Sequence, residues 1–238
     1  MVYDSMMERV LFNDQATQYA LWYQTPEGQY ADTLEKKLFL KLVRPKSGQS
    51  VLDIGCGTGH NLAFFKELEL KAAGIDASKP MLAIASKKLG PDAELYWGHA
   101  EALPFDNDSF DIVTLITVIA FVSDPTKVLK EAGRVARAQI YLGVLNKISL
   151  LGINRRIKGK FRDSIYNQAK FYSIWEIEAM VRRAMGKVPL EWRSTLFSPL
   201  SWHKYIYRLD RLMPSVNNPF GAFLGVKLNV ERGKRNGA

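Results

Sequence analysis

Hydrophobic residues recur along the chain at two spacings. Over residues 7–44 the apolar side chains include Leu34, Leu38 and Leu42, an interval of four that predicts one face of a helix. Downstream, short apolar runs alternate with stretches of helical period. These runs predict strands at 50–54, 72–75, 94–97, 110–116 and 139–144. Strands that alternate with helices in this way form a parallel sheet with helices on both faces.

The final third of the chain adds further helices and two closing strands. Ser173 and Glu176 form a capping box that predicts the start of a helix, and 201–213 has the pattern of an amphipathic helix. Closing strands are expected over 188–197 and 222–230. We therefore predict an α/β fold, a Rossmann-like doubly wound sheet that is mostly parallel with an antiparallel closing strand.

Composition excludes several classes of protein and of site. A single cysteine, Cys56, excludes a disulfide framework and a thiolate metal cluster, and the three histidines are scattered, so no metal site is expected. The longest apolar run, 112–122, is about half of the ~20 residues that a membrane-spanning helix needs. The N-terminus lacks the continuous apolar segment of a signal peptide, so we expect a soluble, cytoplasmic protein.

The net charge of +9 is concentrated in one part of the chain. Residues 1–150 hold 16 basic and 18 acidic side chains, whereas residues 151–238 hold 17 basic and 6 acidic ones. The densest basic run, 155–162, follows the fifth predicted strand. Such an asymmetry carries information about partners, not about the fold.

The first predicted strand leads directly into a glycine-rich loop and a helix. Residues 53–59 read Asp-Ile-Gly-Cys-Gly-Thr-Gly, and Asp76 ends the second strand roughly twenty residues later. Glycines let the backbone approach a ligand closely, and the start of a helix offers unpaired N–H groups. A carboxylate at the position of Asp76 can accept both hydroxyls of a ribose. The loop therefore predicts a nucleoside-containing cofactor.

The spacing of the glycines separates two classes of cofactor. A nicotinamide fingerprint reads G-x-G-x-x-G, whereas this loop is one residue shorter. A loop that binds a pyrophosphate has no need of the acid at Asp53, whereas a cofactor with an ammonium group and no phosphate can use it. A nicotinamide-dependent oxidoreductase is therefore the disfavoured alternative.

Several segments in register with this loop resemble the class I S-adenosylmethionine-dependent methyltransferases. The matching segments are 51–59, 74–78, 81–82, 100–105, 110–113 and 122–125. The similarity covers residues 12 to about 145, and it is to the methyltransferase-11-like branch that includes quinone-biosynthesis and small-molecule enzymes. It implies S-adenosyl-L-methionine as the cofactor.

The resemblance also implies which residues bind the cofactor. Gly55 and Gly57 would pass under its methionine part, and Asp53 would hold its amino group. Asp76 would hold the ribose. The remaining residues that we predict to bind the cofactor are Tyr19, Cys56, His60, Ala77, Met81, His99, Ala100, Glu101, Thr117 and Phe121.

Two positions depart from the pattern of the family. His99 stands where many relatives have an Asp that receives the adenine amino group, and a neutral imidazole nitrogen can accept the same bond. After the fourth strand, relatives often carry Glu-His or His-His, whereas this chain has Ala120 and Phe121. No catalytic base is predicted there, and we assign no catalytic residue from the sequence.

These features predict methyl transfer to a small-molecule acceptor by in-line displacement, in a pocket with Tyr19, Trp22 and Phe121 as aromatic walls. The basic run 155–162 predicts that the acceptor is anionic. In one alternative, this run and the helix at 201–213 contact an anionic membrane, as an enzyme of a lipid or quinone precursor would require. RNA is a less favoured partner, because no nucleic-acid-binding module is recognisable.

The predicted organisation is a single methyltransferase domain over residues 1–238. Its parts are a helical cap over 7–44, a cofactor-binding core over 50–145, and a basic substrate-side region with the closing strands over 146–238.

Overall fold

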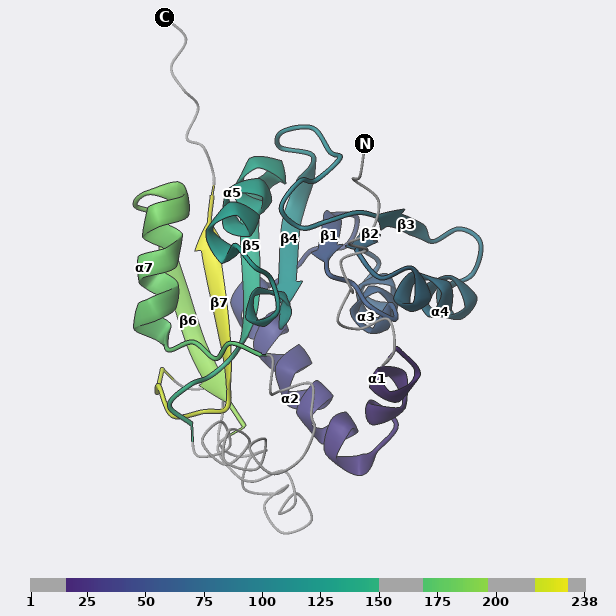
Figure 1. Ribbon diagram of the computed structural model, residues 1–238, viewed down its shortest axis with the longest axis horizontal. Helices are drawn as coiled ribbons and strands as arrows, with labels where there is room; N and C mark the ends of the chain where they lie inside the picture. Colours follow the sequence, from purple (N-terminus) through teal and green to yellow (C-terminus); the bar gives the residue numbers. More distant parts are fainter. Residues whose placement is uncertain (1–15, 150–168, 197–216, 231–238) are drawn as a thin grey trace, which may run out of the picture.

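The computed structural model describes residues 16–149, 169–196 and 217–230. Within these residues the chain forms a seven-stranded sheet in the order β3-β2-β1-β4-β5-β7-β6 (Figure 1). The strands are β1 (Ser50–Ile54), β2 (Lys71–Asp76), β3 (Glu94–Trp97), β4 (Phe110–Ile116), β5 (Ala136–Leu145), β6 (Leu190–Thr195) and β7 (Phe223–Asn229).

Strands β1 to β5 pair in parallel, whereas β7 runs antiparallel to both of its neighbours, β5 and β6. The predicted doubly wound sheet with an antiparallel closing strand is therefore confirmed. The order reverses at β1, which has β2 on one side and β4 on the other. In open α/β sheets, ligands bind beyond the carboxyl ends of the strands at such a reversal.

Helices cover both faces of the sheet (Figure 1). They are α1 (Ala16–Trp22), α2 (Pro26–Val43), α3 (His60–Glu67), α4 (Lys79–Leu89), α5 (Pro125–Val135) and α7 (Ile174–Met185). Successive side chains of β1 point to opposite faces of the sheet. Val51 packs in a cluster with α2 and α3, whereas Leu52 and Ile54 pack in a cluster with α5 and α7. Because both faces are covered, the central strands are apolar along nearly their whole length.

The N-terminal helical segment is interrupted, whereas the pattern over 7–44 predicted continuous helical periodicity. α1 ends at Trp22, and α2 begins at Pro26. The Thr25 side chain caps α2 by accepting a hydrogen bond from the Gly28 backbone N–H at 3.0 Å. Proline favours the first position of a helix and cannot continue a preceding one, so the chain turns at this point.

The capping box predicted at Ser173 is present. The Ser173 hydroxyl accepts from the Glu176 N–H at 3.3 Å, and the Glu176 carboxylate accepts from the Ser173 N–H at 2.7 Å. The helix expected over 201–213 lies outside the described residues. Among the helices that the structure does describe, none has the length and apolar character needed to cross a bilayer.

We expect Gly28→Ala to destabilise the protein although alanine has the higher helix propensity. A Cβ atom at Gly28 would lie 2.0 Å from the Trp22 carbonyl oxygen, so the junction of α1 and α2 would have to open. Overpacking of this kind costs about 1–3 kcal/mol in the free energy of unfolding, which urea denaturation measures. Gln29→Ala, an exposed control on the same turn, should change that free energy by less than about 0.5 kcal/mol. Equal stability of Gly28→Ala and the wild type would contradict this packing.

Candidate active site

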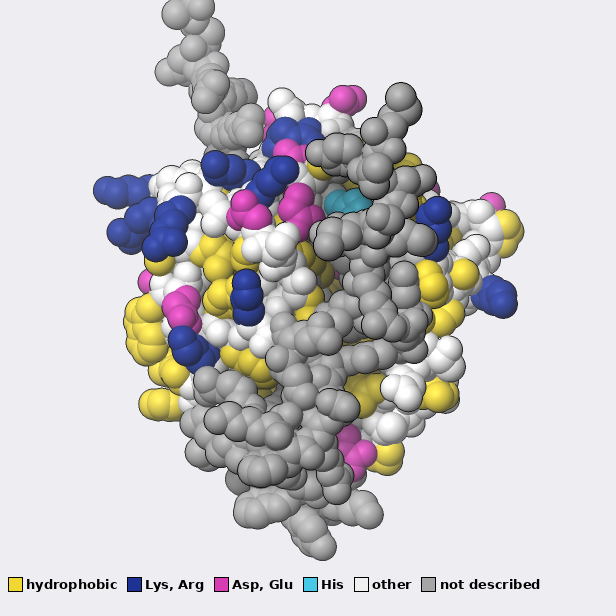
Figure 2. Space-filling view, in the orientation of Figure 1, with side chains coloured by type: hydrophobic (Ala, Val, Ile, Leu, Met, Phe, Trp, Pro, Cys, Tyr) yellow, Lys and Arg dark blue, Asp and Glu magenta, His cyan; other side chains and the backbone are white. Residues whose placement is uncertain are grey.

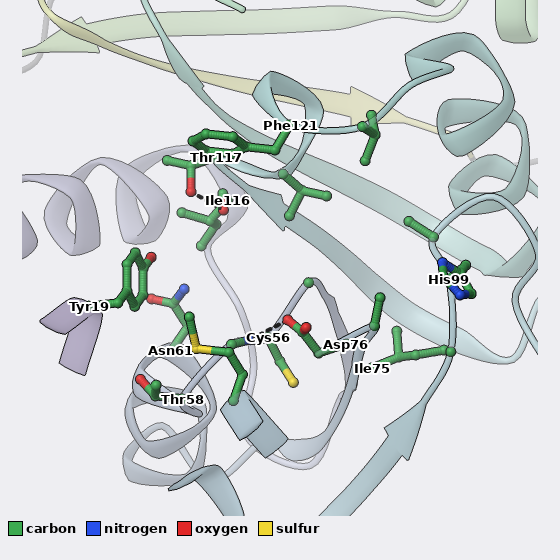
Figure 3. Close-up of a pocket in the computed structure, with 18 of the residues that line it drawn as sticks. Tyr19, Cys56, Thr58, Asn61, Ile75, Asp76, His99, Ile116, Thr117 and Phe121 are labelled. Atoms are coloured by element: carbon green, nitrogen blue, oxygen red, sulfur yellow. Dashed lines mark hydrogen bonds between the residues drawn. The ribbon is translucent and has the colours of Figure 1, made fainter. Parts of the chain in front are cut away.

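A cavity of about 300 Å³ lies at the carboxyl ends of β1, β2 and β4, where the strand order reverses. Figure 3 shows Tyr19 at one end of this cavity and His99 at the other. Thr117 and Phe121, which follow β4, face the glycine loop with Cys56 across the cavity. The location is the one at which open α/β sheets bind their ligands.

The cavity brings together most of the residues predicted to bind the cofactor. Those that line it are Tyr19, Gly55, Cys56, Gly57, His60, Asp76, Ala77, Met81, His99, Ala100, Glu101, Thr117 and Phe121. Asp53 is not among the lining residues. The contacts of all these side chains with a cofactor stay predictions.

The sequence did not single out several other lining residues, which are Tyr23, Thr58, Asn61, Ile75, Gly98, Ile116, Val118, Val122 and Ser123. Tyr23 follows Tyr19 by four residues. In a helical segment this spacing places the two side chains on the same face, so the sequence contained a signal for Tyr23 as a lining residue. Trp22, expected as an aromatic wall, does not line the cavity. Its ring packs instead against the hydrophobic cluster of α2 and against the Tyr23 ring, with centroids 5.0 Å apart.

The glycine loop has a backbone that requires glycine. Gly55, Gly57 and Gly59 adopt left-handed φ angles of +68°, +53° and +70°. A Cβ atom at Gly55 would also lie 2.5 Å from Cγ2 of Val118. The loop is fastened to β2, because the N–H groups of Gly55 and Cys56 donate to the Ile75 carbonyl at 2.7 and 3.1 Å.

The Asp76 carboxylate is fixed by backbone donors at the end of β2. Its two oxygens accept from the Gly57 N–H and the Ser78 N–H, each at 2.8 Å. Burial raises the pKa of Asp76, and the hydrogen bonds from Ser78 and Gly57 partly oppose that shift. The carboxylate is thus a rigid acceptor in the cavity wall.

Asp53 is buried beneath the loop, with 1% of its surface exposed. One of its oxygens accepts from the Thr114 hydroxyl at 2.6 Å, and the other has no partner among the described residues. Burial, with a smaller contribution from Asp76, raises the pKa of Asp53 to about 7. The Thr114 hydroxyl and the neighbouring Asn61 amide oppose that shift, although the amide does not reach hydrogen-bond geometry with the second oxygen. A buried carboxylate with an unpaired oxygen is costly, and a cationic group near the loop would relieve that cost.

The charged groups of the cavity fit a cationic cofactor that has no phosphate. The lining includes the carboxylates of Asp76 and Glu101, and no Lys or Arg is among the described lining residues. A pyrophosphate placed at this loop would face acids without a cationic side chain to balance it. The donors and acceptors present therefore fit S-adenosylmethionine better than a dinucleotide.

Cys56 is unsuited to act as a nucleophile. The side chain is buried, and burial raises the pKa of its thiol far above the ordinary value, with the charges of Asp53 and Asp76 adding to the shift. The thiol stays protonated at neutral pH. No cluster of His, Cys, Asp and Glu suited to a metal ion occurs within the part of the chain that the structure describes.

Thr117 turns the chain sharply out of β4. It adopts a left-handed backbone conformation, with φ of +63°, which is strained for a residue other than glycine. Its N–H donates to the Gly143 carbonyl at 2.8 Å, and its hydroxyl donates to the Ile116 carbonyl at 2.7 Å. The short 3-10 helix η1 (Val118–Ala120) follows, and this turn brings Thr117 and Phe121 to the cavity.

At the Tyr19 end, His60 makes a contact that the sequence did not predict. Its Nε2 lies 2.8 Å from Oδ1 of Asp32, a residue of α2. Burial acts to raise the pKa of Asp32, but hydrogen bonds from His60 and Lys36 outweigh it and lower the pKa. The His60 ring also stacks on Tyr23, with centroids 3.8 Å apart.

Comparisons with known proteins connect this site to a family. Residues 52–142 match the family model described as a methyltransferase domain. The uncharacterized protein MJ1123 of Methanocaldococcus jannaschii is 30% identical over 218 residues, which cover 91% of this chain and 97% of that protein. The demethylmenaquinone methyltransferase of Lactobacillus johnsonii is 36% identical over 118 residues, which cover 46% of this chain and only about half (48%) of that enzyme.

A solved structure extends the similarity to the whole fold. It is the S-adenosylmethionine-dependent methyltransferase, a possible histamine N-methyltransferase, of Thermotoga maritima. The two chains are 26% identical, with a TM-score of 0.73 over 92% of this chain and 98% of that one.

We expect the free protein to lose stability between about pH 4 and pH 7 because of Asp53. Its pKa is about 7 in the fold and 3.8 in a model peptide, so folding favours the protonated acid. The contribution of Asp53 to the free energy of unfolding is therefore fully present below pH 3.8 and is lost as the pH rises through 7. The side chain in Asp53→Asn stays neutral at every pH. Between about pH 4 and pH 7 the free energy of unfolding, measured by chemical denaturation, should therefore fall by roughly 1–4 kcal/mol less in this variant than in the wild type.

Asp111→Asn provides the control for this titration. The Asp111 carboxylate pairs with Arg137, and its pKa is lowered, so its contribution changes only below about pH 4. This variant should keep the slope of the wild type between about pH 4.5 and 7.5. An unchanged slope in Asp53→Asn would contradict the assignment.

Proposed function

Because the chain belongs to the class I S-adenosylmethionine-dependent methyltransferases, we propose that it methylates a small-molecule acceptor that carries an anionic group. The observation that carries the methyl-transfer part of the proposal is the cavity at the strand reversal, which has carboxylates and hydroxyls but no described Lys or Arg in its lining. The cavity suits a cationic methyl donor, and its walls enclose a space suited to a small acceptor. The anionic character of the acceptor rests on the basic run 155–162 alone.

When bound, S-adenosyl-L-methionine supplies a methyl group that its sulfonium centre activates. In the proposed arrangement, Gly55 and Gly57 present backbone to the methionine part, and the buried charge of Asp53 attracts its amino group. Asp76, held by the backbone, accepts the ribose hydroxyls. The His99 end of the cavity, with Glu101, takes the adenine.

The remaining walls act on the acceptor. Thr117 and Phe121 surround the space at the other end together with Tyr19, whose ring also meets the cofactor at the glycine loop. These side chains exclude water and hold the nucleophile close to the methyl group. Ala120 and Phe121 offer no group that can take a proton.

An anionic acceptor is supported by where the basic run 155–162 joins the described chain. After this run, the Lys170 N–H donates to the Ala120 carbonyl at 2.8 Å, beside the cavity wall. The Tyr172 N–H donates to the Leu145 carbonyl at the end of β5, from which the chain departs toward the run. The flank that follows the run thus meets the chain one residue before Phe121 of the cavity wall, which supports the proposal that positive charge in the run attracts an anionic acceptor.

Two similar proteins carry names that suggest other acceptors. The L. johnsonii enzyme is named for demethylmenaquinone, and the T. maritima protein for histamine as a possible substrate. A quinone precursor is the second candidate here, since the basic region could bring the enzyme to an anionic membrane. RNA is less favoured, because the sequence contains no recognisable nucleic-acid-binding module.

We expect S-adenosylhomocysteine to raise the melting temperature of the protein and NADH to leave it unchanged. Asp76→Ala should weaken S-adenosylhomocysteine binding about 10- to 100-fold in calorimetry, because charge-assisted hydrogen bonds are lost. Asp92→Ala, at an exposed position before β3, is the matched control and should bind as the wild type does. A thermal shift with NADH alone would overturn the proposed function.

We expect the methyl acceptor to appear in the anionic aqueous fraction of a host extract incubated with isotopically labelled cofactor, as detected by mass spectrometry. Exchange of Arg155, Arg156 and Lys158 for Ser should then raise the KM for that acceptor about tenfold at low salt, and by less at high salt. Labelling confined to the lipid fraction would favour the quinone candidate, and labelling of a cationic amine would refute the anionic acceptor.

The control for this variant comes from the end of α7. Arg182 and Arg183 lie in its last turn, Lys187 follows two residues after it, and all three are exposed. Figure 2 shows a group of Lys and Arg side chains on this part of the surface. α7 begins beside the end of β5, and its twelve residues carry the last turn roughly 18 Å away from that edge. Exchange of these three residues for Ser should leave the KM unchanged.

A further inference from the structure

Five side chains form a continuous series of contacts that begins in the cavity wall and leads away from it. Tyr19, Tyr23 and His60 line the cavity, whereas Asp32 and Lys36 do not. The Tyr19 and Tyr23 hydroxyls lie 3.1 Å apart. The Tyr23 ring stacks on the His60 ring with an angle of 17° between their planes. Oδ1 of Asp32 lies 2.8 Å from Nε2 of His60, and Oδ2 lies 2.7 Å from Nζ of Lys36. The series links α1, α2 and α3.

The donors and acceptors around the His60 ring determine its orientation. Asp32 provides the acceptor oxygens, so Nε2 of His60 carries the hydrogen that it donates to Oδ1. Lys36 lies 3.3 Å from Nε2, but its ammonium group has only donors, and Oδ2 of Asp32 takes one of them. The imidazole is thus held at Nε2 in either protonation state, and it presents a fixed face to Tyr23.

Helix α1 is short, so its own backbone hydrogen bonds do little to hold its side chains in place. It has seven residues, too few for a stable isolated helix. Ala16 is its one buried residue, and Leu21 leaves 52% of its surface exposed. Tyr19 nevertheless reaches the glycine loop, since a Cβ atom at Gly57 would lie 3.9 Å from Cε1 of Tyr19. Contacts beyond α1 must therefore set the position of the Tyr19 ring.

We propose that Asp32 is a positioning residue that acts through His60 and Tyr23 to hold Tyr19 against the cofactor at the glycine loop. Asp32 itself is not among the residues that line the cavity. Its effect on binding must therefore pass through the side chains between it and the cofactor. The inference rests on the proposed function. It adds that Asp32, a residue of α2 outside the cavity, helps to determine the affinity for the cofactor.

A double-mutant cycle on the full chain tests this role, with S-adenosylhomocysteine as the probe and calorimetry as the measurement. We expect Asp32→Ala to weaken binding roughly three- to tenfold, and Tyr19→Ala to weaken it about tenfold. In the double variant, the loss should be clearly smaller than the product of the two single losses, because part of the effect of Asp32 passes through Tyr19. The remainder can pass through His60, which lines the cavity itself. Asp32→Asn keeps an acceptor oxygen for His60 and should recover most of the affinity.

Asp111→Ala is the matched control. It breaks a 2.6 Å pair with Arg137 and the bonds to Ser50, at the amino ends of β4 and β1 and therefore at the opposite ends of these strands from the cavity. Asp111→Ala should lower thermal stability, while its affinity for S-adenosylhomocysteine stays within about twofold of the wild type. Asp32→Ala should differ from it by losing affinity.

Two results would overturn the positioning role. One is an Asp32→Ala variant that loses stability as Asp111→Ala does but keeps its affinity for S-adenosylhomocysteine. The other is an affinity loss that adds in full to that of Tyr19→Ala. Failure of the wild type itself to bind the probe would instead overturn the proposed function, so the two failures are distinguishable.

Discussion

The hydrogen bond from the Gly57 backbone to the Asp76 carboxylate joins the two halves of the site, and the other features of the cavity depend on it. Together with the bonds from Gly55 and Cys56 to the Ile75 carbonyl, it fastens the loop after β1 to the end of β2. The loop is thereby held with its backbone toward the cavity. A register shift of one residue between the two strands would turn Asp76 to the other face of the sheet and separate the pair.

This fastening places two carboxylates close to an apolar interior. Burial raises the pKa of both Asp53 and Asp76, which means that the empty fold holds them at a cost. A ligand that brings positive charge to the loop relieves that cost, whereas a ligand that brings phosphate increases it. The electrostatics of the loop therefore agree with the family to which the chain belongs, in which the cofactor is a cation.

The two ends of the cavity differ in how they are built. The end with Asp76 and His99 belongs to the sheet and its loops, and backbone hydrogen bonds make it rigid. The end with Tyr19 depends on the short helix α1, which has few buried contacts of its own. Thr117, with its strained turn after β4, completes that end. Binding of the cofactor and choice of the acceptor thus depend on elements of unequal rigidity.

The sequence by itself determined the fold class and the position of the cofactor loop, because strand and helix periods, glycine spacing and the distance to Asp76 are local properties of the chain. Only the tertiary structure decided that Asp32 meets His60, that Trp22 turns away from the cavity, and that Asp53 lies beneath it. Such contacts join elements that are distant in sequence. They depend on the packing of helices against the sheet, which no local pattern encodes.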